Sequence, residues 1–177
     1  MEDELQPLVT AWREANPHIV RFWWDIDRAA KKAVADKISV ISHGFRFSYE
    51  SGILFVELPS GRRLSYVKPR IGVRQFGSEC VTYEGLNLGQ WSRQETYGPK
   101  ITENLVQAVS RDILAYAMKT LGSFFIVGSV HDELIIEFPQ EVAVNMVCEQ
   151  MGRTPPWLPG LLLLRADGYE CEFYRKE

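Results

Sequence analysis

The chain has 177 residues, of which 46% are hydrophobic and 24% charged, and its formal net charge at pH 7 is −3. These values fit one globular domain, or two small lobes at most, and exclude a disordered chain and a membrane protein. The longest purely aliphatic run covers residues 161–164, far short of the ~20 apolar residues of a membrane-spanning helix.

The termini and the cysteines predict an intracellular protein. The first seven residues are acidic and contain no apolar stretch, so they do not form a secretory signal. Cys80, Cys148 and Cys171 are widely spaced and form no CxxC motif. We therefore expect reduced thiols in a cytoplasmic protein and no zinc site.

The charges are unevenly distributed along the chain. Residues 61–74 contain five basic residues and no acidic one, whereas residues 120–152 contain five acidic residues and neither Lys nor Arg. The first stretch could face phosphate and the second could hold a cation, or both are ordinary surfaces of opposite sign. The negative net charge argues against a dedicated, free-standing nucleic-acid module.

The first 36 residues have a helical period. We predict a short helix over residues 5–14 and a second one that begins at Asn16-Pro17, a capping residue followed by proline. Apolar residues recur in the second helix at spacings of three and four, and we interpret the aromatic residues 22–24 as core packing.

From residue 38 to residue 67, β-branched and aromatic residues alternate with polar ones, which predicts a three-stranded meander. Its turns are expected at residues 50–52 and 59–61, with Arg62 and Arg63 near the second. Residues 69–91 contain four glycines and predict loops or short strands.

A third helix pattern covers residues 102–121, with an apolar stripe at Val106, Val109, Ile113 and Ala117. Asn104, Gln107 and Arg111 fall on the opposite face. This polar face is either solvent-facing or a surface whose donors hold the minor-groove acceptors of a duplex without reading its sequence.

Two strands are predicted at residues 124–130 and 134–138, joined by His131, Asp132 and Glu133. The tip lacks the glycine that hairpin turns favour, and its two carboxylates repel each other unless a cation such as Mg²⁺ lies among them. A solvated polar turn is the alternative. A helix over residues 141–151, a proline-rich link and a last strand at residues 168–174 follow, which gives an α+β fold.

Three segments together resemble family A DNA polymerases. Residues 96–108, TYGPKITENLVQA, followed by Arg111-Asp112 and by VHDE at residues 130–133, are similar to the pattern TYGGKxxENxxQAxxRDxLxxA with a later VHDE hairpin. The bacteriophage branch of the DNA polymerase I group has this pattern. The resemblance extends to residues 12–17, 58–62 and 166–169, and therefore covers nearly the whole chain.

The resemblance implies roles for individual residues. Asp132 would be a ligand of the catalytic Mg²⁺ pair, Glu133 would lie beside it as a supporting, second candidate ligand, and His131 would approach the primer terminus. Gln107 matches the family glutamine that touches the minor groove near the primer end. The further candidate DNA contacts are Lys100, Asn104, Arg111, Arg62 and Arg63.

The resemblance also implies an incomplete enzyme. The chain contains neither the DxSxxExR motif with the second metal-binding aspartate nor the nucleotide-binding helix RxxxKxxxFGxxYG. We expect one partial polymerase domain over residues 1–177: a helical fingers part (1–36), a β-rich insertion (37–95) and a palm part (96–177). Its helices would pack on a small antiparallel sheet.

The implied partners are primer-template DNA, a deoxynucleoside triphosphate and the missing N-terminal portion of the polymerase, in the cytoplasm of a bacterial host or virus-infected cell. No membrane is expected. We predict that the isolated chain does not extend primers, since one aspartate and its neighbour cannot fix two metal ions. The alternative is a non-catalytic, duplex-binding or structural remnant; a metal-dependent nuclease would need a second carboxylate cluster. Exposed apolar surface near Trp23 and Trp24 is a candidate for homo-oligomerisation.

Overall fold

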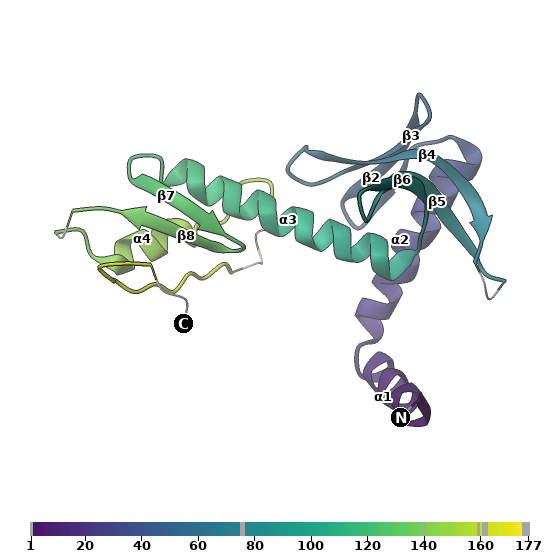
Figure 1. The fold of residues 1–177 in the computed structure, drawn as a ribbon, viewed down its shortest axis with the longest axis horizontal. Helices are drawn as coiled ribbons and strands as arrows, with labels where there is room; N and C mark the ends of the chain where they lie inside the picture. Colours follow the sequence, from purple (N-terminus) through teal and green to yellow (C-terminus); the bar gives the residue numbers. More distant parts are fainter. Residues whose placement is uncertain (1, 75–76, 140, 159, 161–162, 175–177) are drawn as a thin grey trace. The chain divides into compact units, whose positions relative to one another are not determined.

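The fold is α+β, as the sequence predicts, and Figure 1 shows its helices and antiparallel strands. The computed structural model describes residues 2–74, 77–139, 141–158, 160 and 163–174. The chain divides into two compact units, Met1–Val106 and Gln107–Glu177, with the boundary inside helix α3 (Gly98–Thr120). The predicted division into a fingers part, a β-rich insertion and a palm part stays a prediction, because compact units do not identify parts of a polymerase.

The first unit begins with helices α1 (Glu2–Ala15) and α2 (Pro17–Asp36), which confirms both predicted N-terminal helices. Pro17 occupies the first turn of α2, where its missing N–H costs nothing. The Asn16 side chain turns back, because its Nδ2 donates to the Trp12 carbonyl at 2.8 Å. α2 ends at Asp36, and its C-cap residue, Lys37, has a left-handed φ of 55°.

A six-stranded antiparallel sheet follows, with its strands in sequence order. The strands are β1 (Val40–Ser42), β2 (Phe45–Glu50), β3 (Ile53–Glu57), β4 (Arg63–Val73), β5 (Glu79–Asn87) and β6 (Gln90–Thr96). The predicted meander corresponds to β2, β3 and the first half of β4. The expectation of loops or short strands over residues 69–91 is wrong, because β4 continues to Val73 and β5 has nine residues.

Tight turns set the register of this sheet. The loops His43-Gly44, Ser51-Gly52 and Leu88-Gly89 each contain two residues, and both residues of each have positive φ. This is the type I′ geometry, which suits the right-handed twist of a hairpin and requires a residue such as glycine at its second position. In β4, a bulge between Val67 and Arg70 shifts the pairing with β5 by one residue.

The core of the first unit lies between α2 and the sheet, because α2 contacts β1 to β5. Its fully buried residues include Ile26, Ala30, Phe47, Leu54 and Val56. The interpretation of residues 22–24 as core holds only in part: Phe22 packs on Phe45 and Trp23 stacks on Trp12, whereas Trp24 is 45% exposed. The predicted self-association through this region stays a prediction.

A non-local cap fixes the start of α3. The buried side chain of Asp27, on α2, accepts a hydrogen bond from the Gly98 backbone N–H at 2.9 Å and pairs with Lys31 Nζ at 2.6 Å. A Cβ at Gly98 would lie 2.2 Å from the Trp23 carbonyl oxygen. α3 therefore begins four residues before the predicted start, at a position where only glycine fits.

The second unit contains the rest of α3, strands β7 (Phe125–Val130) and β8 (Glu133–Glu137), and helix α4 (Val144–Met151). These confirm the predicted hairpin and the core of the predicted helix. Gln150 ties α4 to the end of α3 by donating to the Thr120 carbonyl at 2.6 Å. The strand predicted at residues 168–174 is wrong, because the described residues from 163 to 174 form no strand.

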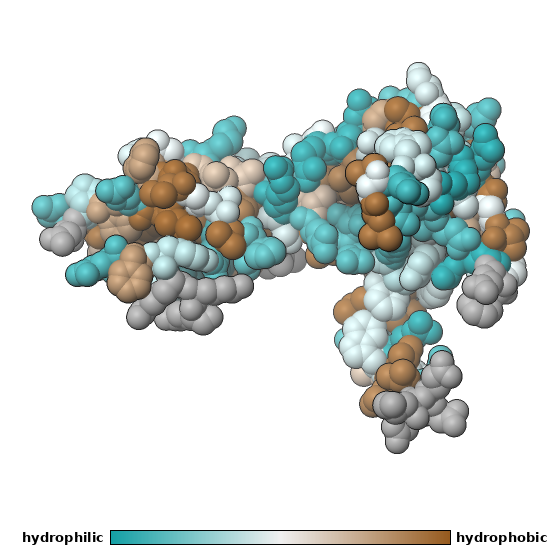
Figure 2. All heavy atoms as spheres, viewed as in Figure 1, coloured by the Kyte–Doolittle hydropathy of each residue, from teal (hydrophilic) through white to brown (hydrophobic). Residues whose placement is uncertain are grey.

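Hydrophobic side chains gather at the surface over β7 and β8 in Figure 2, where Phe125 and Val127 are 68% and 58% exposed. No helix in the described part of the chain combines the length and apolar character needed to cross a membrane.

Candidate functional site

The β7–β8 hairpin closes through a loop of only two residues, His131 and Asp132, because Val130 pairs directly with Glu133. His131 has a φ of 54°. A left-handed conformation costs a residue other than glycine roughly 1–3 kcal/mol, although histidine tolerates it better than most. Unlike the three type I′ turns of the first unit, this loop contains no glycine, so it carries an imidazole and a carboxylate at some conformational cost.

The side chains of His131, Asp132 and Glu133 are all exposed. Glu133 has a partner that the sequence analysis did not predict: the Tyr174 hydroxyl donates to its Oε2 at 3.4 Å. Desolvation raises the pKa of Tyr174, and the charge and hydrogen bond of Glu133 raise it further. The two residues are 41 positions apart, so no local pattern in the sequence could have paired them.

The donor set of the hairpin fits Mg²⁺ only in part. Carboxylates are the oxygen ligands that this hard cation prefers. However, no group of three or more His, Cys, Asp or Glu among the described residues is arranged to hold a metal ion. Asp132 and Glu133 can thus provide some of the ligands of a magnesium site, and a complete site needs further carboxylates.

The predicted DNA-contacting residues of α3 differ in their surroundings. Lys100 is exposed, and Asn104 is half-buried and donates from Nδ2 to the Tyr66 hydroxyl at 3.1 Å. Burial raises the pKa of Tyr66, and the hydrogen bond with Asn104 partly offsets that rise. Gln107 and Arg111 lie one helical turn apart in the second unit, and both are exposed. Asn104 therefore has a structural contact beside its predicted role.

The predicted DNA contacts Arg62 and Arg63 belong to the first unit. Arg63 pairs through Nη1 with Glu50 Oε2 at 3.2 Å and lies over the Phe55 ring, 4.3 Å from its centroid. Arg62 is half-buried, and its backbone N–H donates to Ser60 Oγ at 3.3 Å. Arg63 must leave an exposed ion pair to bind phosphate, which costs little.

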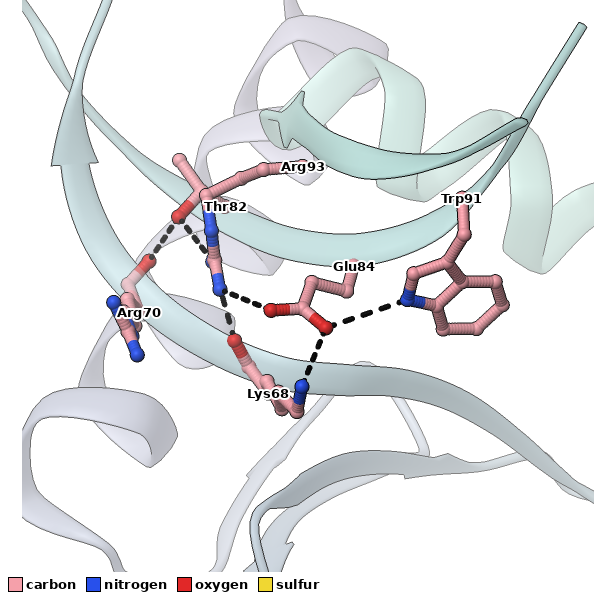
Figure 3. Close-up of polar contacts among 6 residues, drawn as sticks. All are labelled: Lys68, Arg70, Thr82, Glu84, Trp91 and Arg93. Carbon is pink, nitrogen blue, oxygen red and sulfur yellow. Dashed lines mark hydrogen bonds and ion pairs between the residues drawn. The ribbon is translucent and has the colours of Figure 1, made fainter.

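A polar cluster on strands β4, β5 and β6 was missed by the sequence analysis as a group. Figure 3 shows this β4–β6 cluster, which consists of Lys68, Arg70, Thr82, Glu84, Trp91 and Arg93. Glu84 accepts from Lys68 Nζ at 2.7 Å, from Arg93 Nη2 at 3.2 Å and from Trp91 Nε1 at 3.3 Å. The hydrogen bonds from Lys68 and Trp91 lower the pKa of Glu84. The basic stretch at residues 61–74 was the signal that pointed here.

A second set of bonds connects the same cluster to the backbone. Arg93 Nη1 donates to Thr82 Oγ1 at 3.1 Å and to the Lys68 carbonyl at 3.2 Å, and Thr82 Oγ1 donates to the Arg70 carbonyl at 3.3 Å. Arg93 is therefore held at the bulge in β4, between Val67 and Arg70.

Comparison with known proteins gives one informative match. The chain is 47% identical over 182 aligned positions to a DNA polymerase of Bacillus phage SP02. The match covers 99% of this chain but 28% of the relative. The chain matches no protein-family model and no solved structure. The chain therefore aligns with one part of that phage polymerase and spans 28% of its length.

Proposed function

We propose that the chain is the C-terminal palm-and-fingers portion of a family A, DNA polymerase I-like enzyme of the bacteriophage type. The observation that carries the proposal is the 47% identity to a phage DNA polymerase over nearly the whole chain. Two exposed features support the proposal because they present residues of the family motifs to solvent: the two-residue loop of the β7–β8 hairpin, with His131 and Asp132, and Gln107 on α3.

The proposed reaction joins a deoxynucleotide to a primer. The primer 3′-hydroxyl attacks the α-phosphate of a deoxynucleoside triphosphate, and pyrophosphate leaves in line with the attack. Two Mg²⁺ ions, when bound, stabilise the attacking and leaving oxygens. Asp132 is the proposed metal ligand of this chain, Glu133 supports it, and His131 lies near the primer terminus.

Gln107 is the proposed contact to the duplex. Every base pair offers an acceptor in the minor groove, at purine N3 or pyrimidine O2. An amide donor on a rigid helix can bind these acceptors in any sequence, which is what a polymerase requires of the base pair it has just made. Arg111, one turn further along α3, and Lys100 are proposed to contact the DNA beside it.

We propose that the isolated chain does not extend primers. The complete polymerase is proposed to act in the cytoplasm of a bacterial host. Asp132 and Glu133 form a partial ligand set, and two ions ~3.5–4 Å apart need at least one more carboxylate. The two-stranded β7–β8 sheet with its exposed Phe125 and Val127 supports this view, since so small a sheet is marginal alone and its apolar surface is suited to packing against further polymerase structure.

A segment exchange tests the proposal. The chain replaces the matching 28% of the phage SP02 polymerase, and primer extension is measured with Mg²⁺, a primed template and all four deoxynucleotides. We expect the exchanged polymerase to extend primers and the isolated chain to be inactive. A folded exchange protein that binds the primed template but adds no nucleotide would instead favour the non-catalytic, duplex-binding remnant. Extension by the isolated chain would contradict the proposed dependence on further polymerase segments.

A further inference from the structure

We propose that the β4–β6 cluster is a binding site for single-stranded DNA, with phosphates on Arg70, Lys68 and Arg93 and a base stacked on Trp91. The inference deepens the proposed function, on which it rests for the choice of DNA as the nucleic acid. It concerns a part of the chain that is separate from the hairpin residues and from α3.

The charges of the cluster favour an anionic ligand. Lys68 and Arg93 pair with a single carboxylate, that of Glu84, and Arg70 adds a third positive charge, so the cluster is left with a charge of about +2 at neutral pH. The nearest further carboxylate on β6, Glu95, pairs with Arg74 at 3.9 Å. Arg70 lies on the same strand as Lys68, and its guanidinium has no hydrogen bond or ion pair to any residue that the structure describes. It is therefore available to a phosphate oxygen.

The remaining cations are preorganised. Glu84 holds Lys68 and Arg93 at 2.7 Å and 3.2 Å, and Thr82 and the Lys68 carbonyl fix the other guanidinium nitrogen of Arg93. A side chain that is already ordered loses less conformational entropy when a ligand binds. The lowered pKa of Glu84 keeps this arrangement intact throughout the neutral range.

Trp91 provides a stacking surface beside the cations. Its indole N–H is bound to Glu84 at 3.3 Å, which orients the ring, yet the residue is 60% exposed. In Figure 3, Trp91 lies to the right of Glu84, the Arg93 guanidinium lies to its left and Lys68 lies below it. Leu86, its cross-strand partner, is 68% exposed and extends the apolar surface. A base can stack here only if its face is free, which selects an unpaired strand over a duplex.

The experiment measures fluorescence anisotropy of a labelled dT12 strand with the full chain, in EDTA and at several salt concentrations. Trp91→Ala should weaken binding about 5- to 150-fold, and Trp91→Phe should restore most of the loss because a ring remains. Arg70→Gln should weaken binding and lower the slope of log affinity against log salt by about 0.7. Lys32→Gln is the matched control, because it removes one exposed positive charge from α2, and should leave both quantities unchanged.

Three outcomes would overturn the proposal. These are no binding of dT12, equal losses for Arg70→Gln and Lys32→Gln, and a preference for a 12-base-pair duplex over dT12. Far-UV circular dichroism of each variant identifies a folding defect, and the Trp91→Phe variant separates loss of the ring from loss of structure. Because EDTA removes divalent cations, this result does not depend on whether the exchanged polymerase extends primers.

Discussion

Gly98→Ala tests whether the start of α3 is built as the structure shows. Helix propensity alone predicts that alanine stabilises a helix by about 1 kcal/mol relative to glycine. The structure predicts the opposite sign, because the new Cβ would lie 2.2 Å from the Trp23 carbonyl oxygen and 2.9 Å from its carbon. Both atoms belong to the backbone of α2, so neither can move aside as a side-chain tip would.

The cost has two parts. Forcing one extra carbon into a packed site costs about 1–3 kcal/mol. Any shift that relieves the clash weakens the hydrogen bond from the Gly98 N–H to buried Asp27, a charged acceptor whose bonds contribute about 1.5–3 kcal/mol. After subtraction of the gain of about 1 kcal/mol from helix propensity, we expect Gly98→Ala to lower the free energy of unfolding by about 2–5 kcal/mol.

Urea unfolding followed by far-UV circular dichroism measures this difference. Gly160→Ala is the control, because its Cβ would meet no atom of the described residues within 4 Å and its backbone is not left-handed. The control substitution should leave the free energy of unfolding unchanged or raise it by up to about 1 kcal/mol. If Gly98→Ala unfolds at the same urea concentration as the unaltered chain, the close approach of α3 to α2 is wrong.

Three further substitutions or conditions give distinct signatures. Thr96→Val should raise the free energy of unfolding by about 1 kcal/mol in the same urea assay, because the buried Thr96 hydroxyl has no hydrogen-bond partner among the described residues; a loss of stability would mean that this hydroxyl is bonded. Phe47→Ala should lower it by about 3–5 kcal/mol, since Phe47 is fully buried, whereas exposed Ile41→Ala should cost under about 1 kcal/mol. The hydrogen bond from His43, followed by the charges of Arg28 and His43, lowers the pKa of Asp25 from its ordinary 3.8. The contribution of ionised Asp25 to the free energy of unfolding is therefore complete above that pH and is lost as the pH falls below it. The difference in Tm between the unaltered chain and Asp25→Asn should shrink only below about pH 4, and a difference that is constant down to pH 2 would contradict this.

Local patterns predicted those elements whose stability depends on neighbours in the sequence. The helical period between Pro17 and Asp36, and the alternation on both sides of His131-Asp132, are complete within each element. The true start of α3 was missed because its cap, Asp27, lies 71 residues earlier. The strand predicted at residues 168–174 was wrong because a local pattern was present without a partner. Tyr169 and Phe173 have the spacing of a strand, but no neighbouring strand pairs with them among the described residues, and both are exposed.

The glycines of residues 69–91 misled the sequence analysis for a physical reason. Gly72 and Gly85 lie inside strands, where a Cβ would come within 2.8 Å of Thr82 and 3.0 Å of Gln94 respectively, so they permit close packing of neighbouring side chains and do not break the strands. For the candidate site, the order of motif residues predicted the hairpin and the α3 residues. The hydrogen-bond partners of Asn104 and Glu133 are Tyr66 and Tyr174 respectively, and only the fold brings these tyrosines near.

We propose that Asp132 holds a catalytic metal ion in a DNA polymerase, and one comparison of rates tests this role. The most direct measurement is the rate of primer extension by the exchanged polymerase that carries Asp132→Ala, compared with Glu137→Ala at the far end of the same hairpin. Both variants remove one exposed carboxylate from this hairpin. We expect Asp132→Ala to lower the rate by about 10²-fold or more and Glu137→Ala to leave it within about twofold. Equal rates for the two variants, or full activity of Asp132→Ala, would contradict it.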